Sequence, residues 1–152
     1  MNEKNRMKIE IKADLENVAI IRVALSSFIS TLDITIDELM DIKTAISEAV
    51  TNAIEHAYPE DKKEDALVFV SAYIYSDDED IIKIEVEDTG IGIEDIDTAM
   101  LPTYTSKPEL EHAGMGFTIM ETFMDEILID SNKDKGTKIT LIRKIKKKKS
   151  KA

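Results

Sequence analysis

Two strand-like segments separated by only three residues constrain the fold more than any other feature of the sequence. Residues 66–76 (ALVFVSAYIYS) and 80–88 (DIIKIEVED) have the composition of strands, and the acidic residues 77–79 form a turn between them. Residues 126–131 and 137–144 form a second such pair around the turn sequence NKDKG. Because a short turn joins strands that run in opposite directions, both pairs are predicted to be antiparallel hairpins.

The other segments place helices beside these hairpins. Thr35-x-x-Glu38 is a capping box that opens a helix. In chain order we predict a strand over 7–13, helices over 15–31 and 35–58, a short helix near 94–100, a loop over 101–114 and a helix over 116–124. Strand and helix do not alternate strictly. We therefore predict an α+β fold, a two-layer α/β sandwich with a mixed, mainly antiparallel sheet and helices on one face.

Length and composition suit one globular domain. The chain has 152 residues, of which 43% are hydrophobic, enough for a single sizeable core. No apolar run approaches the roughly 20 residues that cross a bilayer, and the charged start MNEKNRMKIE lacks the apolar core of a secretion signal. The absence of cysteine excludes disulfides, thiolate metal sites and thiol nucleophiles. We expect a cytoplasmic protein with no membrane contact and one domain over residues 1–145.

Charge is unevenly distributed along the chain. The formal net charge is −11, but seven bases gather at the end: Arg143, Lys144, Lys146, Lys147, Lys148, Lys149 and Lys151. Without them, 13 bases face 31 acids, a net charge of −18 for the body. Such a body repels nucleic acid phosphates, so we expect no direct nucleic acid partner. Residues 146–152 are predicted to be a disordered basic tail, the alternative being a tail that binds an acidic partner.

Three polar residues recur every four positions along the predicted helix over 35–58. Glu48, Asn52 and His56 therefore share one side of the helix. Taken singly, Glu48 and Asn52 could belong to a solvated helix face. His56 is interpreted as a structural residue that closes the helix C-terminus favourably.

Two glycine clusters follow at the ends of other elements. DTGIG, residues 88–92, comes directly after a strand, where Asp88 could accept a hydrogen bond from a ligand amine, although an ordinary turn has the same composition. GMGF, residues 114–117, opens a helix and exposes N–H groups that favour an anion, but alone it is weak evidence for a phosphate site.

The three motifs in this order point to a nucleotide phosphate site with Mg²⁺. This hard cation takes oxygen ligands and keeps several waters, and Asn52 offers a carbonyl oxygen. Glu48, one turn earlier, could orient a water or accept a hydroxyl proton in phosphoryl transfer.

On these motifs the sequence resembles the Bergerat-fold ATPases, the superfamily of gyrase, Hsp90, histidine kinases and MutL. Glu48–Asn52 is similar to the family's N box, residues 88–92 to its first glycine box and residues 114–116 to its second. IKTAISEAVTNAIEHAY and TSKPELEHAGMGFTIMETFMDE are closer still to the anti-sigma factor kinases of spore-forming bacteria. The resemblance covers roughly residues 7 to 145.

The resemblance implies a role for each matching position. Glu48 would be the general base, Asn52 would hold Mg²⁺, and Asp88 would receive the adenine amino group of ATP, with Gly90 and Gly92 shaping the pocket. Residues 101–113 would be a lid over the nucleotide. The remaining ATP-binding positions would be Thr105, Ser106 and Lys107 near the phosphates, Gly114 and Gly116 with phosphate-binding amides, and Thr137 by the adenine. Arg22 would serve partner docking.

The resemblance also implies partners and an activity. It implies a homodimer that inhibits a sporulation sigma factor of the sigma F type and phosphorylates a serine of an anti-anti-sigma protein. The family often has arginine in the lid where this chain has His112, so Lys107 could supply the charge there.

Three other functions remain open at this point. The first is an anti-sigma kinase of the general-stress type, which shares these boxes. The second is the ATP-binding half of a histidine kinase, although the chain is too short to include dimerisation helices with a phosphoacceptor histidine. The third is a non-catalytic nucleotide-sensing module, against which the intact Glu48 argues.

Overall fold

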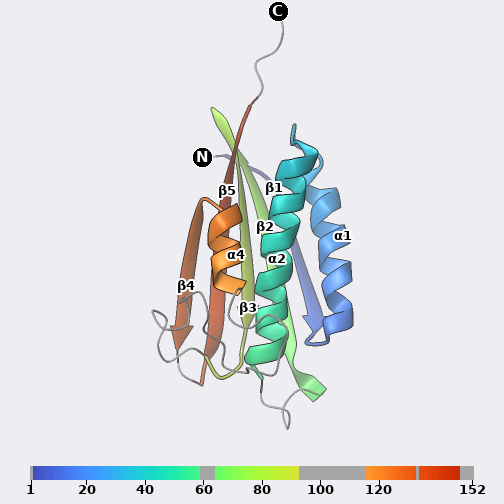
Figure 1. Cartoon of the computed structure of the whole chain (residues 1–152), viewed down its shortest axis with the longest axis vertical. Coiled ribbons are helices and arrows are strands. Elements are labelled where there is room, and N and C mark those ends of the chain that lie inside the picture. The colour runs from blue at the N-terminus through green and yellow to red at the C-terminus, as the bar shows by residue number, and fades with distance from the viewer. Residues whose placement is uncertain (1, 59–63, 93–115, 133, 148–152) are drawn as a thin grey trace, which may run out of the picture.

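A five-stranded sheet covered on one face by helices makes up the computed structural model of the chain, which describes residues 2–58, 64–92, 116–132 and 134–147 (Figure 1). The elements in chain order are β1 (Asn2–Lys12), the 3-10 turn η1 (Leu15–Asn17), α1 (Val18–Ile29), α2 (Ile36–His56), β2 (Leu67–Ser76), β3 (Glu79–Asp88), α4 (Gly116–Phe123), β4 (Glu126–Asn132) and β5 (Gly136–Lys146). The short helix expected near 94–100 and the loop over 101–114 lie outside the described residues.

The sheet has the strand order β1-β2-β3-β5-β4, and all pairings between its described strands are antiparallel. Both predicted hairpins are therefore confirmed: Val70 pairs with Val86 across β2 and β3, and Ile129 pairs with Ile139 across β4 and β5. The pairing of β3 with β5 brings Asp88 opposite Thr137. Two residues that the sequence separates widely thus meet at the same end of the sheet.

Strand β1 begins at Asn2, earlier than the predicted start at residue 7. Residues 2–6 are exposed, so they show no alternation of apolar and polar side chains that could have revealed them. The register of the β1–β2 pairing shifts between Glu3 and Asn5, which is a local irregularity in this edge strand.

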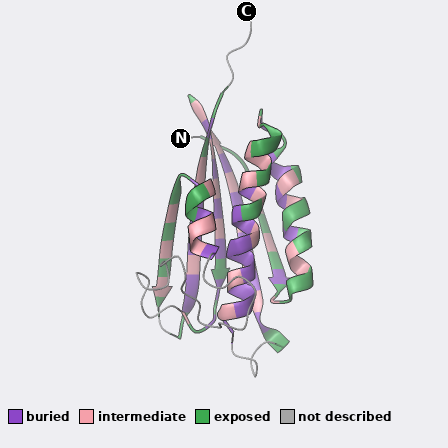
Figure 2. Cartoon of the chain, viewed as in Figure 1, coloured by how far each residue is buried: buried purple, intermediate pink, exposed green. Residues whose placement is uncertain are grey.

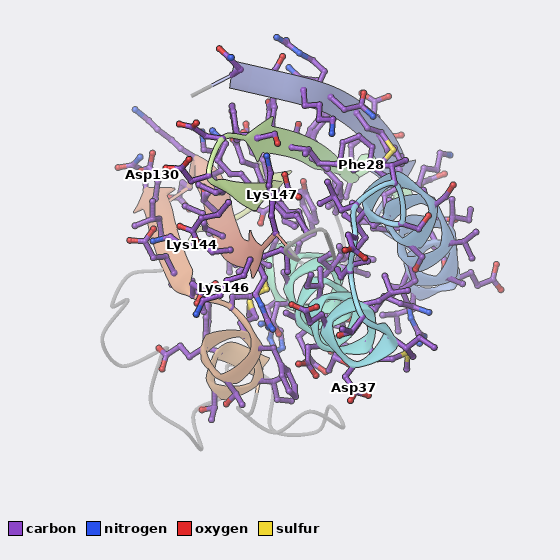
Figure 3. All side chains as sticks on the ribbon, turned by 90° about the horizontal axis from the view of Figure 1, so that it is seen from above. Phe28, Asp37, Asp130, Lys144, Lys146 and Lys147 are labelled. Carbon is purple, nitrogen blue, oxygen red and sulfur yellow. The ribbon has the colours of Figure 1, made fainter. Side chains whose placement is uncertain are left out.

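The hydrophobic core lies between the sheet and the helices. Seen from above, the helices α1, α2 and α4 all lie on the same side of the curved sheet (Figure 3). Buried positions alternate along β2 and β3, and the buried stripe of α2 faces them (Figure 2). The largest fully buried side chains include Ile42, Ile46, Ile82, Ile84 and Leu141. Each such side chain contributes about 1.5–3 kcal/mol relative to an exposed one, so the core holds α2 firmly on the sheet.

Local signals set where the first two helices begin. Thr35 Oγ1 accepts a hydrogen bond from the Glu38 amide, and the Glu38 carboxylate accepts one from the Thr35 amide, so the predicted capping box is present. The helix expected over 15–31 instead starts as the 3-10 turn η1, because the Asp14 carboxylate accepts from the Glu16 amide and caps that turn first.

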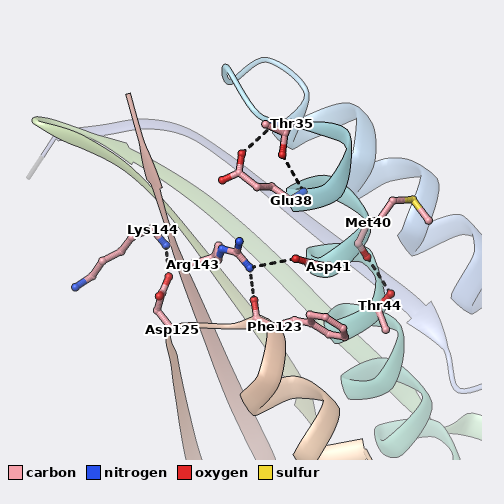
Figure 4. Close-up of polar contacts among 9 residues, drawn as sticks. All are labelled: Thr35, Glu38, Met40, Asp41, Thr44, Phe123, Asp125, Arg143 and Lys144. Atoms are coloured by element: carbon pink, nitrogen blue, oxygen red, sulfur yellow. Dashed lines mark hydrogen bonds and ion pairs between the residues drawn. The ribbon is translucent and has the colours of Figure 1, made fainter. Parts of the chain in front are cut away.

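Arg143 joins α4, α2 and β5 at the end of the molecule where α2 starts (Figure 4). Its guanidinium donates to the Phe123 carbonyl oxygen at 2.5 Å, and Nη1 lies 3.8 Å from the Asp41 carboxylate. Next to it, the Lys144 amide donates to Asp125 Oδ2 at 2.7 Å. The C-terminal end of α4 is thus fixed, while its N-terminal end points to the opposite end of the sheet.

None of the helices in the described part of the chain is long and apolar enough to cross a membrane. The last strand reaches Lys146, and residues 148–152 of the predicted tail lie outside the described residues.

Candidate nucleotide-binding site

Helix α2 and the start of α4 bring two of the predicted motifs into contact. A Cβ atom on Gly116 would lie 2.7 Å from Asn52 Nδ2, which is closer than real contacts allow. With glycine at this position, the first turn of α4 stands directly against the Asn52 amide, whereas a larger residue would require the Asn52 side chain to move. The first N–H groups of α4, which have no partner within the helix, thus start beside a side-chain oxygen that suits a hard cation.

Glu48 lies one helical turn before Asn52 on α2. Its side chain is buried, with a residue exposure of 8%. Two further polar residues of the same helix, Thr51 and Glu55, are equally buried. His56 is the last residue of α2, where the sequence placed it, and its Nε2 lies 4.0 Å from Glu55 Oε2.

The first glycine cluster folds back against the C-terminal end of α2. The Ile91 amide donates to the Ala57 carbonyl oxygen at 2.7 Å. A Cβ atom on Gly90 would lie 2.0 Å from that same oxygen, so only glycine fits there. Gly92 has φ 75°, in the left-handed region that glycine adopts without strain. Residues 89–92, which we call the glycine loop, therefore sit directly beside the helix that carries Glu48 and Asn52.

Asp88 stands at the end of β3, at the base of the glycine loop. It is buried, and its Oδ1 accepts a hydrogen bond from the Gly90 amide at 2.9 Å. Burial raises the pKa of Asp88, while hydrogen bonds from the backbone of Gly90 and Thr137 oppose that rise. A buried carboxylate held by backbone donors is well suited to accept one further hydrogen bond from a ligand amine.

The turn between β4 and β5 closes the other side of the glycine loop. The Asp134 amide donates to the Ile91 carbonyl oxygen at 2.7 Å. Gly136 has φ 103°, and a Cβ there would lie 2.1 Å from the Asp88 carbonyl oxygen. Thr137 is buried beside Asp88, and its hydroxyl hydrogen-bonds with that of Ser131 at 2.7 Å. The structure thus brings Asp88, Gly90 and Thr137 together.

Tyr58 is a residue at this site that the sequence did not reveal. It is buried, and its hydroxyl contacts both Leu67 and Thr89. In the sequence it only marked the end of a helix before Pro59. The one available signal was that a buried tyrosine hydroxyl needs partners.

The other predicted positions are separate or undescribed. Arg22 is exposed on α1, which lies beside α2 on the side away from α4 (Figure 1). Five further positions lie outside the described residues: Thr105, Ser106, Lys107, Gly114, and His112 of the predicted lid.

A magnesium ion held mainly by water and phosphate fits the residues present. Among the residues that the structure describes, no group of three or more His, Cys, Asp or Glu side chains could hold a metal. Mg²⁺ is commonly bound through one or two protein oxygens plus substrate phosphates. A single amide oxygen from Asn52, next to the open backbone that Gly116 provides, agrees with that mode of binding.

Comparison with known proteins identifies relatives that match most of the chain, including the segments of the candidate site. Residues 11–143 match the family described as the histidine kinase-like ATPase domain. An anti-sigma F factor of Clostridium perfringens (strain ATCC 13124) is 55% identical over 141 residues, which are 93% of this chain and 97% of that protein. The anti-sigma F factors of Clostridium beijerinckii and Clostridium novyi are 51% and 50% identical, each over at least 92% of this chain and 94% of the relative.

The chain therefore belongs to the histidine kinase-like ATPase family, and within it to the anti-sigma F factor family. The predicted resemblance to sporulation anti-sigma factors is confirmed at this level.

A solved structure shows the same fold at low identity. The crystal structure of the RsbU and RsbW domains of a Mycobacterium tuberculosis protein superimposes with a TM-score of 0.65 and 21% identity. The match covers 97% of this chain and 35% of that longer one. The predicted α+β sandwich of the Bergerat type is therefore confirmed.

Proposed function

We propose that this protein is an ATP-dependent serine kinase that also binds and inhibits a sporulation sigma factor. Its kinase substrate would be a serine of an anti-anti-sigma protein, and the working form would be a homodimer. The proposal rests on the family to which the chain belongs and on the geometry of the candidate site.

The observation that carries the nucleotide part is the convergence of two segments, the start of α4 and the glycine loop, on the C-terminal part of α2 and the residue that follows it. Gly116 stands against Asn52, and the glycine loop stands against Ala57. A ligand with an amine at one end and phosphates at the other matches this arrangement, because Asp88 offers an acceptor at the glycine loop while α4 offers amide donors. Adenosine triphosphate with Mg²⁺ has that chemistry.

Each residue then has a stated task. Asp88 would accept a hydrogen bond from the adenine amino group, with Gly90, Gly92 and Thr137 shaping the surrounding pocket. Asn52 would hold Mg²⁺, which neutralises phosphate charge when bound. The lid positions Thr105, Ser106, Lys107 and Gly114 would complete the phosphate site, as the family resemblance implies.

Glu48 would act as the general base for transfer to serine. As the serine oxygen bonds to the γ-phosphorus, its proton passes to the Glu48 carboxylate and the bond to the leaving ADP breaks. No covalent enzyme intermediate is needed.

Binding of the sigma factor would use a different surface, the exposed side of α1 around Arg22. Because α1 lies across α2 from α4, this surface is separated from the candidate phosphate site (Figure 1). Inhibition and phosphorylation should therefore be separable by substitution.

The test compares Glu48→Gln with the unsubstituted protein, using labelled ATP and the purified anti-anti-sigma protein and sigma factor. We expect phosphoryl transfer to fall by about 10²–10⁴-fold, because the amide cannot take a proton. ATP binding and retention of the sigma factor should persist. Arg22→Ala should show the reverse pattern, with nucleotide binding kept and sigma retention weakened.

Glu55→Gln is the matched control, since it removes an equally buried carboxylate from the same helix. It should leave transfer near the parental rate. Transfer by Glu48→Gln at the parental rate would refute the proposed base, and loss of ATP binding in that variant would assign Glu48 a structural or metal-holding role.

A further inference from the structure

The hydroxyl of Tyr58 ties together two segments that are distant in sequence. It donates a hydrogen bond to the Leu67 carbonyl oxygen at 2.5 Å and accepts one from the Thr89 amide at 2.9 Å. The Thr89 hydroxyl lies 3.3 Å away. A phenol has one proton to donate and two lone pairs to accept with, so this buried hydroxyl uses its full capacity to fix the glycine loop onto the first residue of β2.

Thr89, the residue anchored by Tyr58, lies between Asp88 and Gly90 in the part of the site proposed to bind adenine. Thr89 follows Asp88 and precedes Gly90, whose amide donates to the Asp88 carboxylate. The next residue, Ile91, is held by the carbonyl oxygen of Ala57, the neighbour of Tyr58. Two adjacent residues just past the end of α2 therefore hold the glycine loop on either side of Gly90, Tyr58 through its side chain and Ala57 through its backbone.

We infer that Tyr58 is a positioning residue for base recognition, which holds the Asp88 carboxylate where it accepts a 6-amino purine and rejects a 6-oxo purine. This inference rests on the proposed binding of ATP. A fixed acceptor pairs with an amino group, whereas a 6-oxo group would place two acceptors face to face. Discrimination of this kind requires that the acceptor cannot move away, because a mobile carboxylate would turn aside at little cost.

Removing only the hydroxyl should relax that constraint. In Tyr58→Phe the ring still fills its buried place, but the Thr89 amide and the Leu67 carbonyl lose a partner. The glycine loop would stay attached through Ile91 and Ala57 and gain freedom at Thr89. The predicted signature is a change in the preference for one purine over another rather than a uniform loss of nucleotide binding.

The experiment measures dissociation constants of the full-length chain for ATP and for inosine triphosphate, both with Mg²⁺, by calorimetry. We expect the unsubstituted chain to prefer ATP. In Tyr58→Phe, the ratio of the dissociation constants for inosine triphosphate and ATP should be about tenfold smaller. Asp88→Asn should lose the preference as well. Tyr73→Phe is the matched control, since it removes a hydroxyl from the partly exposed side of β2 and should keep the preference.

The outcomes separate this inference from the proposed function. If the parent prefers ATP and Tyr58→Phe keeps that preference, with or without a lower melting temperature, Tyr58 is merely structural and the inference is wrong. If the parent binds both nucleotides equally, both the inference and the adenine role of Asp88 are wrong.

A measurement on the unsubstituted chain covers the case in which Tyr58→Phe does not fold. Hydrogen exchange of the Thr89 amide should be slower with saturating ATP than with saturating inosine triphosphate, because only the amino group engages the segment that Tyr58 holds. Equal protection by both nucleotides would overturn the inference.

Discussion

The two ends of helix α2 are closed in opposite ways. At the N-terminal end, Thr35 and Glu38 satisfy each other's amides through a capping box that spans four residues. At the C-terminal end, Ala57 and Tyr58 are held by partners from other parts of the chain: Ile91, Thr89 and Leu67. The N-terminal end is closed by residues next to it in the sequence, whereas the C-terminal end is closed by residues that are distant in the sequence.

This difference separates stability from function along a single helix. The N-terminal closure contributes only to helix formation, since its partners are near neighbours. The C-terminal closure fixes the glycine loop against the end of the helix that carries Asn52 and Glu48, so changes there should alter ligand binding as well as folding. Substitutions at the two ends test this distinction.

Gly90→Ala should have the largest effect, because its new Cβ would lie 2.0 Å from the Ala57 carbonyl oxygen, a backbone atom that cannot turn away. We expect a loss of about 2–4 kcal/mol in the free energy of unfolding, measured by urea denaturation, together with loss of ATP binding. Gly116→Ala is the matched control: its Cβ meets the Asn52 side chain at 2.7 Å, which can shift. That variant should lose metal-dependent ATP affinity with less loss of stability, and equal destabilisation by both would contradict the distinction.

Acidic pH should weaken ATP binding through Asp88. Burial raises the pKa of this carboxyl, so its ionisation opposes folding as the pH rises through that pKa. Binding runs the other way, because the carboxylate is a stronger acceptor for an amine than the protonated acid. We expect affinity to fall by about tenfold as the pH is lowered through the raised pKa.

Calorimetry at several pH values measures the ATP affinity. Asp88→Asn provides the reference, because the phosphates of ATP titrate in the same way with either protein. The variant should bind weakly with a flatter pH profile. Parallel profiles for the two proteins would show that Asp88 does not face the base.

Thr35→Ala should have the smallest effect and should act on stability alone. Losing the cap is expected to cost about 1 kcal/mol, measured as a lower urea midpoint with an unchanged slope. Nucleotide affinity should stay at the parental value. A change in affinity would mean that the two ends of α2 are coupled.

What the sequence could predict follows the same division between local and distant contacts. The hairpins, the capping box and the order of the motifs depend on neighbouring residues, and each was visible as a pattern. The identity of the loop residues Asp88, Gly90 and Gly92 was also predictable, since a glycine-rich turn after a strand is a local signal.

Contacts between distant segments could not be predicted from composition or period. Nothing in the sequence near Tyr58 indicates that its hydroxyl meets Thr89, thirty-one positions later. The sequence indicates only that Gly136 belongs to a turn. The structure shows that a side chain at this position would clash with the Asp88 carbonyl oxygen. The start of β1 could not be predicted either. Residues 2–6 are exposed, so they need no alternation of apolar and polar side chains.

The two edges of the sheet also bear on how the protein behaves at high concentration. Strand β1 carries the register shift between Glu3 and Asn5 and exposes Lys8 and Glu10, while β4 exposes the acidic residues Glu126 and Asp130. Irregular register and charged side chains on edge strands discourage the addition of further strands from other molecules. Both edges therefore carry features that oppose amyloid-like stacking on the apolar interior strands.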